Sequence, residues 1–314
     1  MCRSFRGQRI LVTGASGFIG SHLCFRLSQQ GAEVHAVYRS RHPANPGDQQ
    51  WWQADLANLA EVRKIVQKAQ PQLIFHLASH VKGAPNLENV LPTFQSNLQS
   101  TVNLLTLAAE TGCRIVLTGS LAEPEAGNGE ICPSAPYAAA KWASSGYARM
   151  FHALYKVPVL NTRVFMVYGP GQRDLSKLIP YVTLSLLQGK SPKLSSGERL
   201  VDWIYVSDVV NGFLALAQAF DVDGTTLDLG SGSLVSIREI VQQLALLIDS
   251  KVNVEFGALP DRPLEPTRVA KTGETFAKIG WKPEVSLQEG LESTVNWYRG
   301  ALEHDPEMCK DLLV

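Results

Sequence analysis

The chain has 314 residues, of which 45% are hydrophobic and 18% charged, as in a globular protein of one large domain or two ordinary ones. Its 29 basic and 29 acidic residues balance, so it lacks the positive charge with which proteins bind nucleic acids and anionic membranes. The five cysteines are scattered without a CxxC pair, and no segment reaches the ~18 apolar residues of a membrane span. We therefore expect a cytoplasmic protein with reduced thiols, no metal site and no membrane or nucleic-acid partner.

Short β-branched runs alternate with longer amphipathic segments through the first half of the chain. The runs predict strands over residues 9–13, 33–38, 73–77, 114–118 and 159–164. The segments between them predict helices over residues 18–30, 59–69, 90–111 and 137–155. This order is typical of right-handed βαβ units, and it predicts an α/β fold with a doubly wound parallel sheet of the Rossmann type.

Shorter elements follow residue 167, where turns rich in Gly and Pro interrupt the chain. Residues 200–206 and 226–229 predict strands, and residues 208–219, 237–247 and 287–297 predict helices. We expect residues 1–166 to form a dinucleotide-binding domain, to which residues 200–230 return. Residues 167–199 and 231–314 are expected to form a smaller α/β lobe that binds the substrate at the carboxyl ends of the sheet strands.

A glycine-rich turn separates the first predicted strand from the first predicted helix. Gly14, Gly17 and Gly20 have the spacing GxxGxxG. Glycine permits a tight turn and lets a diphosphate approach the N-terminus of the following helix. The alternative is a glycine-rich turn without a ligand, but the strand before it and the helix after it favour a dinucleotide site.

Tyr137 and Lys141 are one helical turn apart and project from the same helix face. A phenol titrates near pH ~10, so it acts as a base at neutral pH only when a nearby cation stabilises the phenolate. The ammonium group of Lys141 can supply that cation and can also hold a cofactor ribose. Together with the glycine-rich turn, the pair predicts nicotinamide-dependent hydride transfer with Tyr137 as the acid/base.

Further motifs extend nearly from end to end of the chain. They lie at residues 13–20, 55–56, 74–78, 97, 118–120, 163–169, 202–208 and 280–283. With the Tyr137/Lys141 pair, they resemble the extended short-chain dehydrogenase/reductase family, in the branch that acts on nucleotide-linked sugars. The resemblance implies the fold described above and a nicotinamide cofactor.

Ser120 follows the strand predicted at residues 114–118. The resemblance implies that its hydroxyl bonds the sugar oxygen at which hydride is exchanged, beside the Tyr137 hydroxyl; otherwise Ser120 caps a loop. The family's 4,6-dehydratases carry two acids directly after this position. Here Leu121 and Ala122 follow, and Glu123 comes one residue too late. We therefore do not expect dehydration.

The end of the second predicted strand bears on the choice of cofactor. An acidic residue there binds the adenosine ribose of NAD, but this chain has Tyr38 followed by Arg39. A guanidinium suits a 2′-phosphate, so we expect NADP in preference to NAD unless Arg39 is a solvated surface charge. His76 is expected to pack beside the cofactor, because no partner has metal-ligand spacing. The cofactor-binding residues that the resemblance implies are Gly14, Ser16, Gly17, Phe18, Ile19, Gly20, Arg39, Asp55, Leu56, Leu77, Ala78, Ser79, Asn97, Tyr137, Lys141 and Phe165.

The expected substrate contacts depart from the family pattern. Met166 stands where many members have an Asn that contacts the nucleotide, and Val201 stands where many have an Arg. Arg199 lies two residues upstream of Val201 and can serve instead, and Arg262 matches the arginine that holds the diphosphate. Either arginine could be a surface charge. Ser120, Met166, Arg199 and Arg262 are the expected substrate-binding residues.

These features predict a nucleotide-sugar epimerase that works by transient hydride transfer at C4 of the sugar. The alternative is an NADPH-dependent reductase of a 4-keto-sugar nucleotide, or of a related natural-product ketone, which needs the same residues and which Tyr38 and Arg39 favour. The resemblance also implies a homodimer packed through the helices near residues 97–109 and 137–155. Candidates for that contact, or for the core of a single chain, are Leu104, Leu105, Ala108, Trp142 and Met150.

Overall fold

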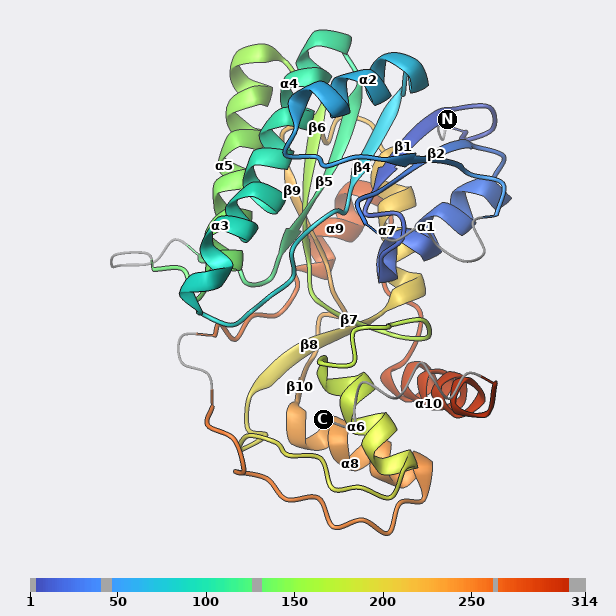
Figure 1. Cartoon of the computed structure of the whole chain (residues 1–314), viewed down its shortest axis with the longest axis vertical. Coiled ribbons are helices and arrows are strands. Elements are labelled where there is room, and N and C mark those ends of the chain that lie inside the picture. Colours follow the sequence, from blue (N-terminus) through green and yellow to red (C-terminus); the bar gives the residue numbers. More distant parts are fainter. Residues whose placement is uncertain (1–3, 41–46, 126–131, 262–264, 305–314) are drawn as a thin grey trace.

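The computed structural model describes residues 4–40, 47–125, 132–261 and 265–304. A parallel sheet with the strand order β3-β2-β1-β4-β5-β6-β9 runs through the larger part of the molecule (Figure 1). Its strands are β1 (Arg9–Thr13), β2 (Glu33–Tyr38), β3 (Gln50–Gln53), β4 (Leu73–His76), β5 (Arg114–Ser120), β6 (Val159–Val164) and β9 (Thr226–Leu229). β1 pairs with both β2 and β4, so the strand order reverses there. The predicted doubly wound sheet is confirmed, and β1/β4 is the point at which such sheets bind ligands.

Helices cover both faces of this sheet because its strands are apolar on both sides. Ile10 and Val12 of β1 belong to one core with α1 and α7, whereas Leu11 belongs to a second core with α2, α4 and α5. The helices are α1 (Phe18–Gln29), α2 (Leu59–Ala69), α4 (Ser100–Thr111), α5 (Pro136–Tyr155) and α7 (Val206–Gln218). None of the described helices is long and apolar enough to cross a membrane.

The second core contains several of the residues that were candidates for the dimer contact. Leu104, Leu105 and Ala108 are completely buried within it, so they pack inside one chain. Trp142 keeps 37% of its surface exposed, and Met150 is partly buried against the same core. Of the five candidates, only these two can reach another subunit.

A smaller lobe lies at the carboxyl ends of the large-sheet strands, since β6 runs almost directly into β7 of the second sheet (Figure 1). That sheet has the order β10-β8-β7. Its strands are β7 (Met166–Tyr168), β8 (Leu200–Tyr205) and β10 (Leu234–Ser236), and α6 (Leu178–Leu187), α8 (Ile237–Ile248) and α10 (Leu287–His304) pack around them. α9 (Thr272–Ile279) returns to contact β9.

The segment 200–230 is divided between the two sheets. α7 and β9 join the large sheet as expected, but β8 pairs with β7 and β10 in the small one. The buried Asp202 carboxylate on β8 accepts hydrogen bonds from the backbone N–H groups of Ser231, Gly232 and Ala270 at 2.6–3.0 Å. β8 is thus tied to the second lobe and to the segment that enters α9.

The helix predicted over residues 90–111 is interrupted. It begins as α3 (Val90–Thr93), passes through a π-helical turn at Phe94–Gln99 and continues as α4. The hydroxyls of Thr101 and Ser144 donate to the Asn97 carbonyl oxygen within this turn, at 2.6 and 3.3 Å. Side chains from two helices therefore stabilise the wider turn.

Five elements have no counterpart in the sequence prediction: β3, β7, β10, α6 and α9. The three strands have only three or four residues each, too few for an alternating pattern. α6 is apolar on nearly every side and carries Pro180 in its first turn, so it shows no helical period either. Residues 252–256, between two predicted helices, form no regular element.

Candidate active site

The glycine-rich turn closes tightly against neighbouring backbone. Gly14 has a φ of +67°, and a Cβ atom on it would lie 2.7 Å from the Ala78 amide nitrogen. A Cβ atom on Gly20 would lie 2.1 Å from the Gly14 carbonyl oxygen. Both positions therefore exclude a side chain, which keeps the turn against the end of β4 and the start of α1 against β1.

The N-terminus of α1 suits an anionic ligand. Its N-cap residue, Gly17, has no side chain to cap the helix, and the first turn contains no acidic residue. Ser16 and Gly17 are exposed, and Phe18 and Ile19 are partly buried beside them. The backbone N–H groups and the dipole of the helix favour a diphosphate at this place, so these residues fit the phosphates of a dinucleotide.

Arg39 and Asp55 lie at the carboxyl ends of the paired strands β2 and β3. Arg39 is exposed, and its Nη1 donates to the Ser96 hydroxyl at 3.1 Å. The Asp55 carboxylate accepts the Ala57 N–H at 3.0 Å, while Leu56 is buried in the second core. A guanidinium and a carboxylate are thus available at one edge of the sheet, on the β2 side of the glycine-rich turn.

The segment after β4 offers a buried hydroxyl. Ser79 Oγ is buried and has no hydrogen-bond partner among the described residues, as expected for a group that meets a ligand. Leu77 and Ala78 are partly buried beside it. Asn97 lies behind this segment: its side chain accepts the His80 N–H at 2.6 Å and donates to the His80 carbonyl at 3.2 Å. Asn97 therefore holds the loop and its amide is already occupied.

His76 is a buried residue of the sheet, as expected. Its Nδ1 lies 2.8 Å from Thr13 Oγ1 and its Nε2 lies 3.1 Å from Thr101 Oγ1. Burial and the charge of Lys141 lower its pKa to about 3, so it stays neutral in solution. No group of three or more metal-binding side chains occurs in the parts of the chain that the structure describes.

Ser120, Tyr137 and Lys141 meet at the carboxyl end of β5. Ser120 is the last residue of that strand, and the other two lie in the first turns of α5, which Pro136 begins. Ser120 lies close enough to Tyr137 for its side chain to lower the pKa of the Tyr137 hydroxyl. Lys141 Nζ donates to the Thr118 carbonyl at 2.7 Å and lies 5.9 Å from the centre of the Tyr137 ring.

Burial dominates the titration of this pair. It raises the pKa of Tyr137 above its usual value, against the hydrogen bond from Ser120, which lowers it. It lowers the pKa of Lys141 to about 8, against the charge of Glu123, which raises it. The pKa of Tyr137 is therefore raised overall, because desolvation of the phenolate is the largest effect.

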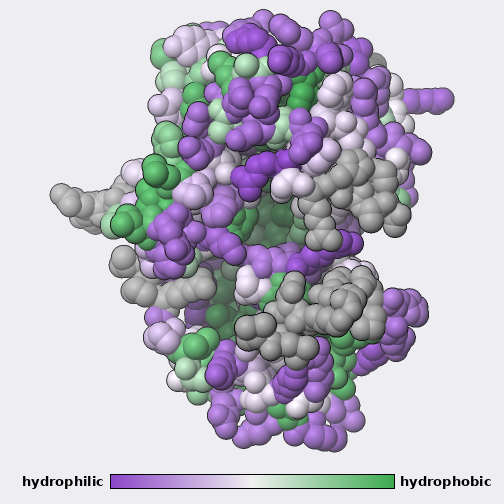
Figure 2. Space-filling model, viewed as in Figure 1, coloured by the Kyte–Doolittle hydropathy of each residue, from purple (hydrophilic) through white to green (hydrophobic). Residues whose placement is uncertain are grey.

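The expected substrate residues lie in the second lobe or at its border. Met166 is partly buried between the core of the large sheet and that of the small lobe, and Phe165 beside it is 4% exposed. Arg199 forms an ion pair with Glu265. Arg262 lies outside the described residues. Figure 2 shows that the molecule is hollowed between the two lobes, with hydrophobic residues visible inside.

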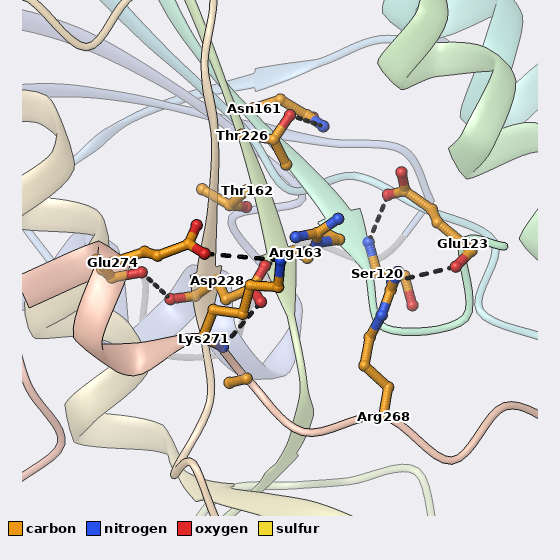
Figure 3. A network of polar contacts seen from close by, with 12 residues as sticks. Ser120, Glu123, Asn161, Thr162, Arg163, Thr226, Asp228, Arg268, Lys271 and Glu274 are labelled. Carbon is orange, nitrogen blue, oxygen red and sulfur yellow. Dashed lines mark hydrogen bonds and ion pairs between the residues drawn. The ribbon is translucent and has the colours of Figure 1, made fainter. Parts of the chain in front are cut away.

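Two further residues contact the site without having been singled out from the sequence. Glu123 accepts the Ser120 N–H at 2.8 Å, and Arg268 Nη1 donates to the Glu123 carbonyl at 3.1 Å (Figure 3). Glu123 was discounted because of its spacing from Ser120. Arg268 is 145 residues from Glu123, and no pattern in the sequence links the two.

Similarity to known proteins extends over most of the chain. The family described as NAD dependent epimerase/dehydratase matches residues 10–230. The UDP-glucose 4-epimerase of Mycolicibacterium smegmatis is 30% identical, with 93% of this chain and 99% of that protein covered. The UDP-glucuronic acid decarboxylase 1 of Xenopus tropicalis is also 30% identical, with 95% of this chain and 73% of that protein covered.

Solved structures share the same architecture. The UDP-glucose 4-epimerase of Thermus thermophilus, in complex with NAD, is 28% identical with a TM-score of 0.82, over 94% of this chain and 100% of that one. The resemblance seen in the motifs is confirmed. The chain belongs to the NAD-dependent epimerase/dehydratase family of the extended short-chain dehydrogenases/reductases.

Proposed function

We propose that the protein is a nicotinamide-dependent 4-epimerase of nucleotide-linked sugars. The observation that carries this proposal is the meeting of Ser120, Tyr137 and Lys141 at the end of β5. Two relatives named as UDP-glucose 4-epimerases, at 30% and 28% identity, support it. Residues 1–166, with 206–230, bind the cofactor, and residues 167–205 and 231–314 hold the substrate.

The chain has groups suited to each part of the cofactor. The diphosphate lies on Gly14, Ser16, Gly17, Phe18, Ile19 and Gly20 at the start of α1. Asp55 and Leu56 serve the adenine, and Leu77, Ala78 and Ser79 pass beneath the adenosine, with Asn97 behind them. Lys141 holds the second ribose, with the Tyr137 ring packed beside the cofactor near Phe165. A bound nicotinamide supplies the acceptor and donor of the hydride at C4.

Tyr137 and Ser120 act on the oxygen at C4. Tyr137 would remove the proton of the C4 hydroxyl as a general base while the C4 hydride passes to the bound nicotinamide, and Ser120 Oγ would bond the same oxygen, so that the alcohol becomes a ketone. The keto-sugar then rotates within the site, so that its other face is presented for reduction. Tyr137 returns the proton to the C4 oxygen when C4 is reduced on that face. Met166, Arg199 and Arg262 contact the nucleotide part. To bind a diphosphate, Arg199 must break its ion pair with Glu265. The free energy of breaking that pair weakens diphosphate binding, relative to an arginine without an ion pair.

A redox balance tests the reaction. Protein purified without added cofactor should carry nicotinamide. If the cofactor were released before the keto-sugar is reduced again, the reaction would stop at the ketone. Incubated with UDP-, GDP-, CDP- and dTDP-sugars, it should interconvert one pair of 4-epimers with no net change in the absorbance of reduced nicotinamide. The Tyr137→Phe variant purified in the same way is the blank. Stoichiometric loss of NADPH with a 4-keto-sugar, and no epimer from any ordinary sugar nucleotide, would show a reductase instead.

The finer choice of cofactor is NADP, and it rests on Arg39. No acidic residue stands at the end of β2, and the Arg39 guanidinium lies beside the Ser96 hydroxyl, which together suit a 2′-phosphate. Arg39→Asp should therefore weaken NADP binding about ten- to a hundred-fold, the value of one charge-assisted contact. NAD affinity should change little or rise.

Calorimetric titration of both cofactors measures this preference. Arg299→Asp, on the exposed face of α10, makes the same change of charge in the other lobe and should leave both affinities unchanged. If Arg39→Asp binds the two cofactors as the unsubstituted protein does, Arg39 is a solvated charge.

The proposal includes a homodimer that packs through α5 and the segment before α4. Leu87, Leu91 and Phe94 are more than 45% exposed there, and Trp142 of α5 adds to the same edge, where hydrophobic residues are visible in Figure 2. Such a surface favours contact with a second copy. Light scattering at micromolar concentration should give twice the 34.3 kDa of one chain.

A charge in this surface should dissociate the dimer. Leu91→Glu is expected to give the mass of a single chain, whereas Leu246→Glu, on an exposed site of α8, should remain dimeric. A single-chain mass for the unsubstituted protein would refute the dimer.

A reducing compartment such as the cytoplasm is part of the same proposal, since Cys24 and Cys113 are buried free thiols.

A further inference from the structure

Glu123 is a buried carboxylate directly behind Ser120. Only 5% of its surface is exposed. Its Oε1 accepts the Ser120 N–H at 2.8 Å, and its Oε2 accepts the Ser145 hydroxyl at 2.7 Å. Ser145 Oγ in turn accepts a hydrogen bond from Asn161 at 2.7 Å. Both oxygens of Glu123 are engaged inside the protein, so this carboxyl group does not act on the substrate as an acid.

The backbone makes room for this carboxylate. A Cβ atom on Gly119 would lie 2.3 Å from Glu123 Oε1 and 2.3 Å from the Thr162 carbonyl oxygen, so only glycine permits the approach. The Glu123 N–H donates to the Ser120 carbonyl at 3.1 Å, which closes a turn. Arg268 reaches the same turn from the segment before α9, through the Glu123 carbonyl (Figure 3). The turn that carries Ser120 is therefore fixed from α5 and from the second lobe.

Among the described residues, four ionisable side chains surround the Glu123 carboxylate. Tyr137 and Lys141 face it from α5, Arg163 from β6 and Arg268 from the segment before α9. Its negative charge raises the pKa of Tyr137 and that of Lys141. Burial raises its own pKa, and hydrogen bonds from Ser145 and Ser120 oppose that rise.

We infer that Glu123 is a positioning residue for hydride transfer, which fixes Ser120 through its backbone N–H and places a negative charge behind the Tyr137–Lys141 pair. This inference rests on the proposed function. The carboxylate keeps Lys141 protonated in a buried site, where an ammonium without a counter-charge is unstable. In return it makes the phenolate harder to form, so the charge sets the pH at which the pair works.

Glu123→Gln removes the charge and keeps the contact to Ser120. The amide oxygen still accepts the Ser120 N–H, but the amide nitrogen cannot accept the Ser145 hydroxyl, a loss that Ser145→Ala measures separately. Because that charge raises both pKa values, the pH profile of kcat should move to lower pH. Arginine side chains stay charged, and His76 stays neutral, at the pH values at which the enzyme is assayed. A change in the pH profile of kcat therefore reports on Tyr137 and Lys141.

Glu125→Gln is the matched control. Glu125 is exposed and also pairs with Arg268, so its removal changes the charge nearby without touching Ser120, and the profile should not move. Ser145→Ala keeps the carboxylate and removes one of its two donors. It should lower kcat about three- to tenfold with the pH profile in place, since one bond to a charged group is lost.

A spectroscopic titration keeps the inference separate from the proposed reaction. The ultraviolet tyrosinate titration of Tyr137 is the difference between each protein and its Tyr137→Phe counterpart, and it needs no substrate. Its midpoint should be lower in Glu123→Gln. Absence of epimerase activity, together with this shift, would reject the reaction and retain the role of the charge. A folded Glu123→Gln with unmoved midpoint and profile would overturn the inference, and so would unchanged kcat in Ser145→Ala if Glu123→Gln fails to fold.

Discussion

Tyr137→Phe is expected to lower kcat by about 100-fold or more, the usual range for a lost general acid–base. The ring stays in place, so the packing at the start of α5 is kept and only the proton-transferring oxygen is lost. Cofactor affinity should stay within about twofold, because a change confined to kcat is the mark of an interaction made in the transition state. Initial rates with the substrate found in the redox-balance experiment, and calorimetry with the cofactor, measure the two effects.

Tyr147→Phe is the control on the same helix. Its side chain is 40% exposed, so loss of its hydroxyl should leave kcat unchanged. Retention of more than about a tenth of kcat in Tyr137→Phe would exceed what general acid–base catalysis allows and would reject Tyr137 as the acid/base.

Gly20→Ala is expected to destabilise the protein by about 3 kcal/mol, the upper part of the range for overpacking. The new Cβ atom would lie 2.1 Å from the Gly14 carbonyl oxygen and 3.0 Å from Ala15 Cα, and backbone cannot rotate away as a side chain can. The start of α1 must then move off β1. Cofactor affinity should fall with stability, because the same turn presents the helix N-terminus to the diphosphate.

Gly146→Ala makes the same chemical change in α5 without the contact. No heavy atom lies within 4 Å of the added Cβ, so the variant should gain about 0.5–1 kcal/mol from reduced backbone entropy in the unfolded chain. Urea unfolding of both variants, and cofactor titration, compare them. Equal stability of the two would mean that the turn around Gly20 is looser than the structure describes.

The main elements could be predicted because their patterns are local. The strands at residues 9–13 and 159–164 are short β-branched runs, and α5 carries Tyr137 and Lys141 at i and i+4, which fixes their common face in any helix. The glycine-rich turn is local for the same reason. A strand, a GxxGxxG turn and a helix in sequence leave one arrangement for a diphosphate, and the structure has the three elements in place.

Elements that depend on distant partners could not be predicted. β7 has three residues and exists because β8, more than thirty residues later, pairs with it. At the π turn of Phe94–Gln99, hydroxyls from two helices donate to one carbonyl group. Leu104 and Leu105 look the same in the sequence whether they face a second subunit or the core, and only the position of α4 over the sheet decides that they are buried.

The sequence by itself determined the fold class, the family and the three groups that meet at the end of β5, because each of these depends on spacing along one element or on motifs close together. Only the tertiary structure decided what surrounds them. Glu123 follows Ser120 by three residues, a distance that excluded it as an acid on the substrate, yet the turn after β5 folds its carboxylate back beneath Ser120. Arg268 arrives there from 145 residues away. The charge and the contacts around Tyr137 therefore come from the turn after β5, from neighbouring elements of the large lobe and from a distant segment, and no local pattern records them.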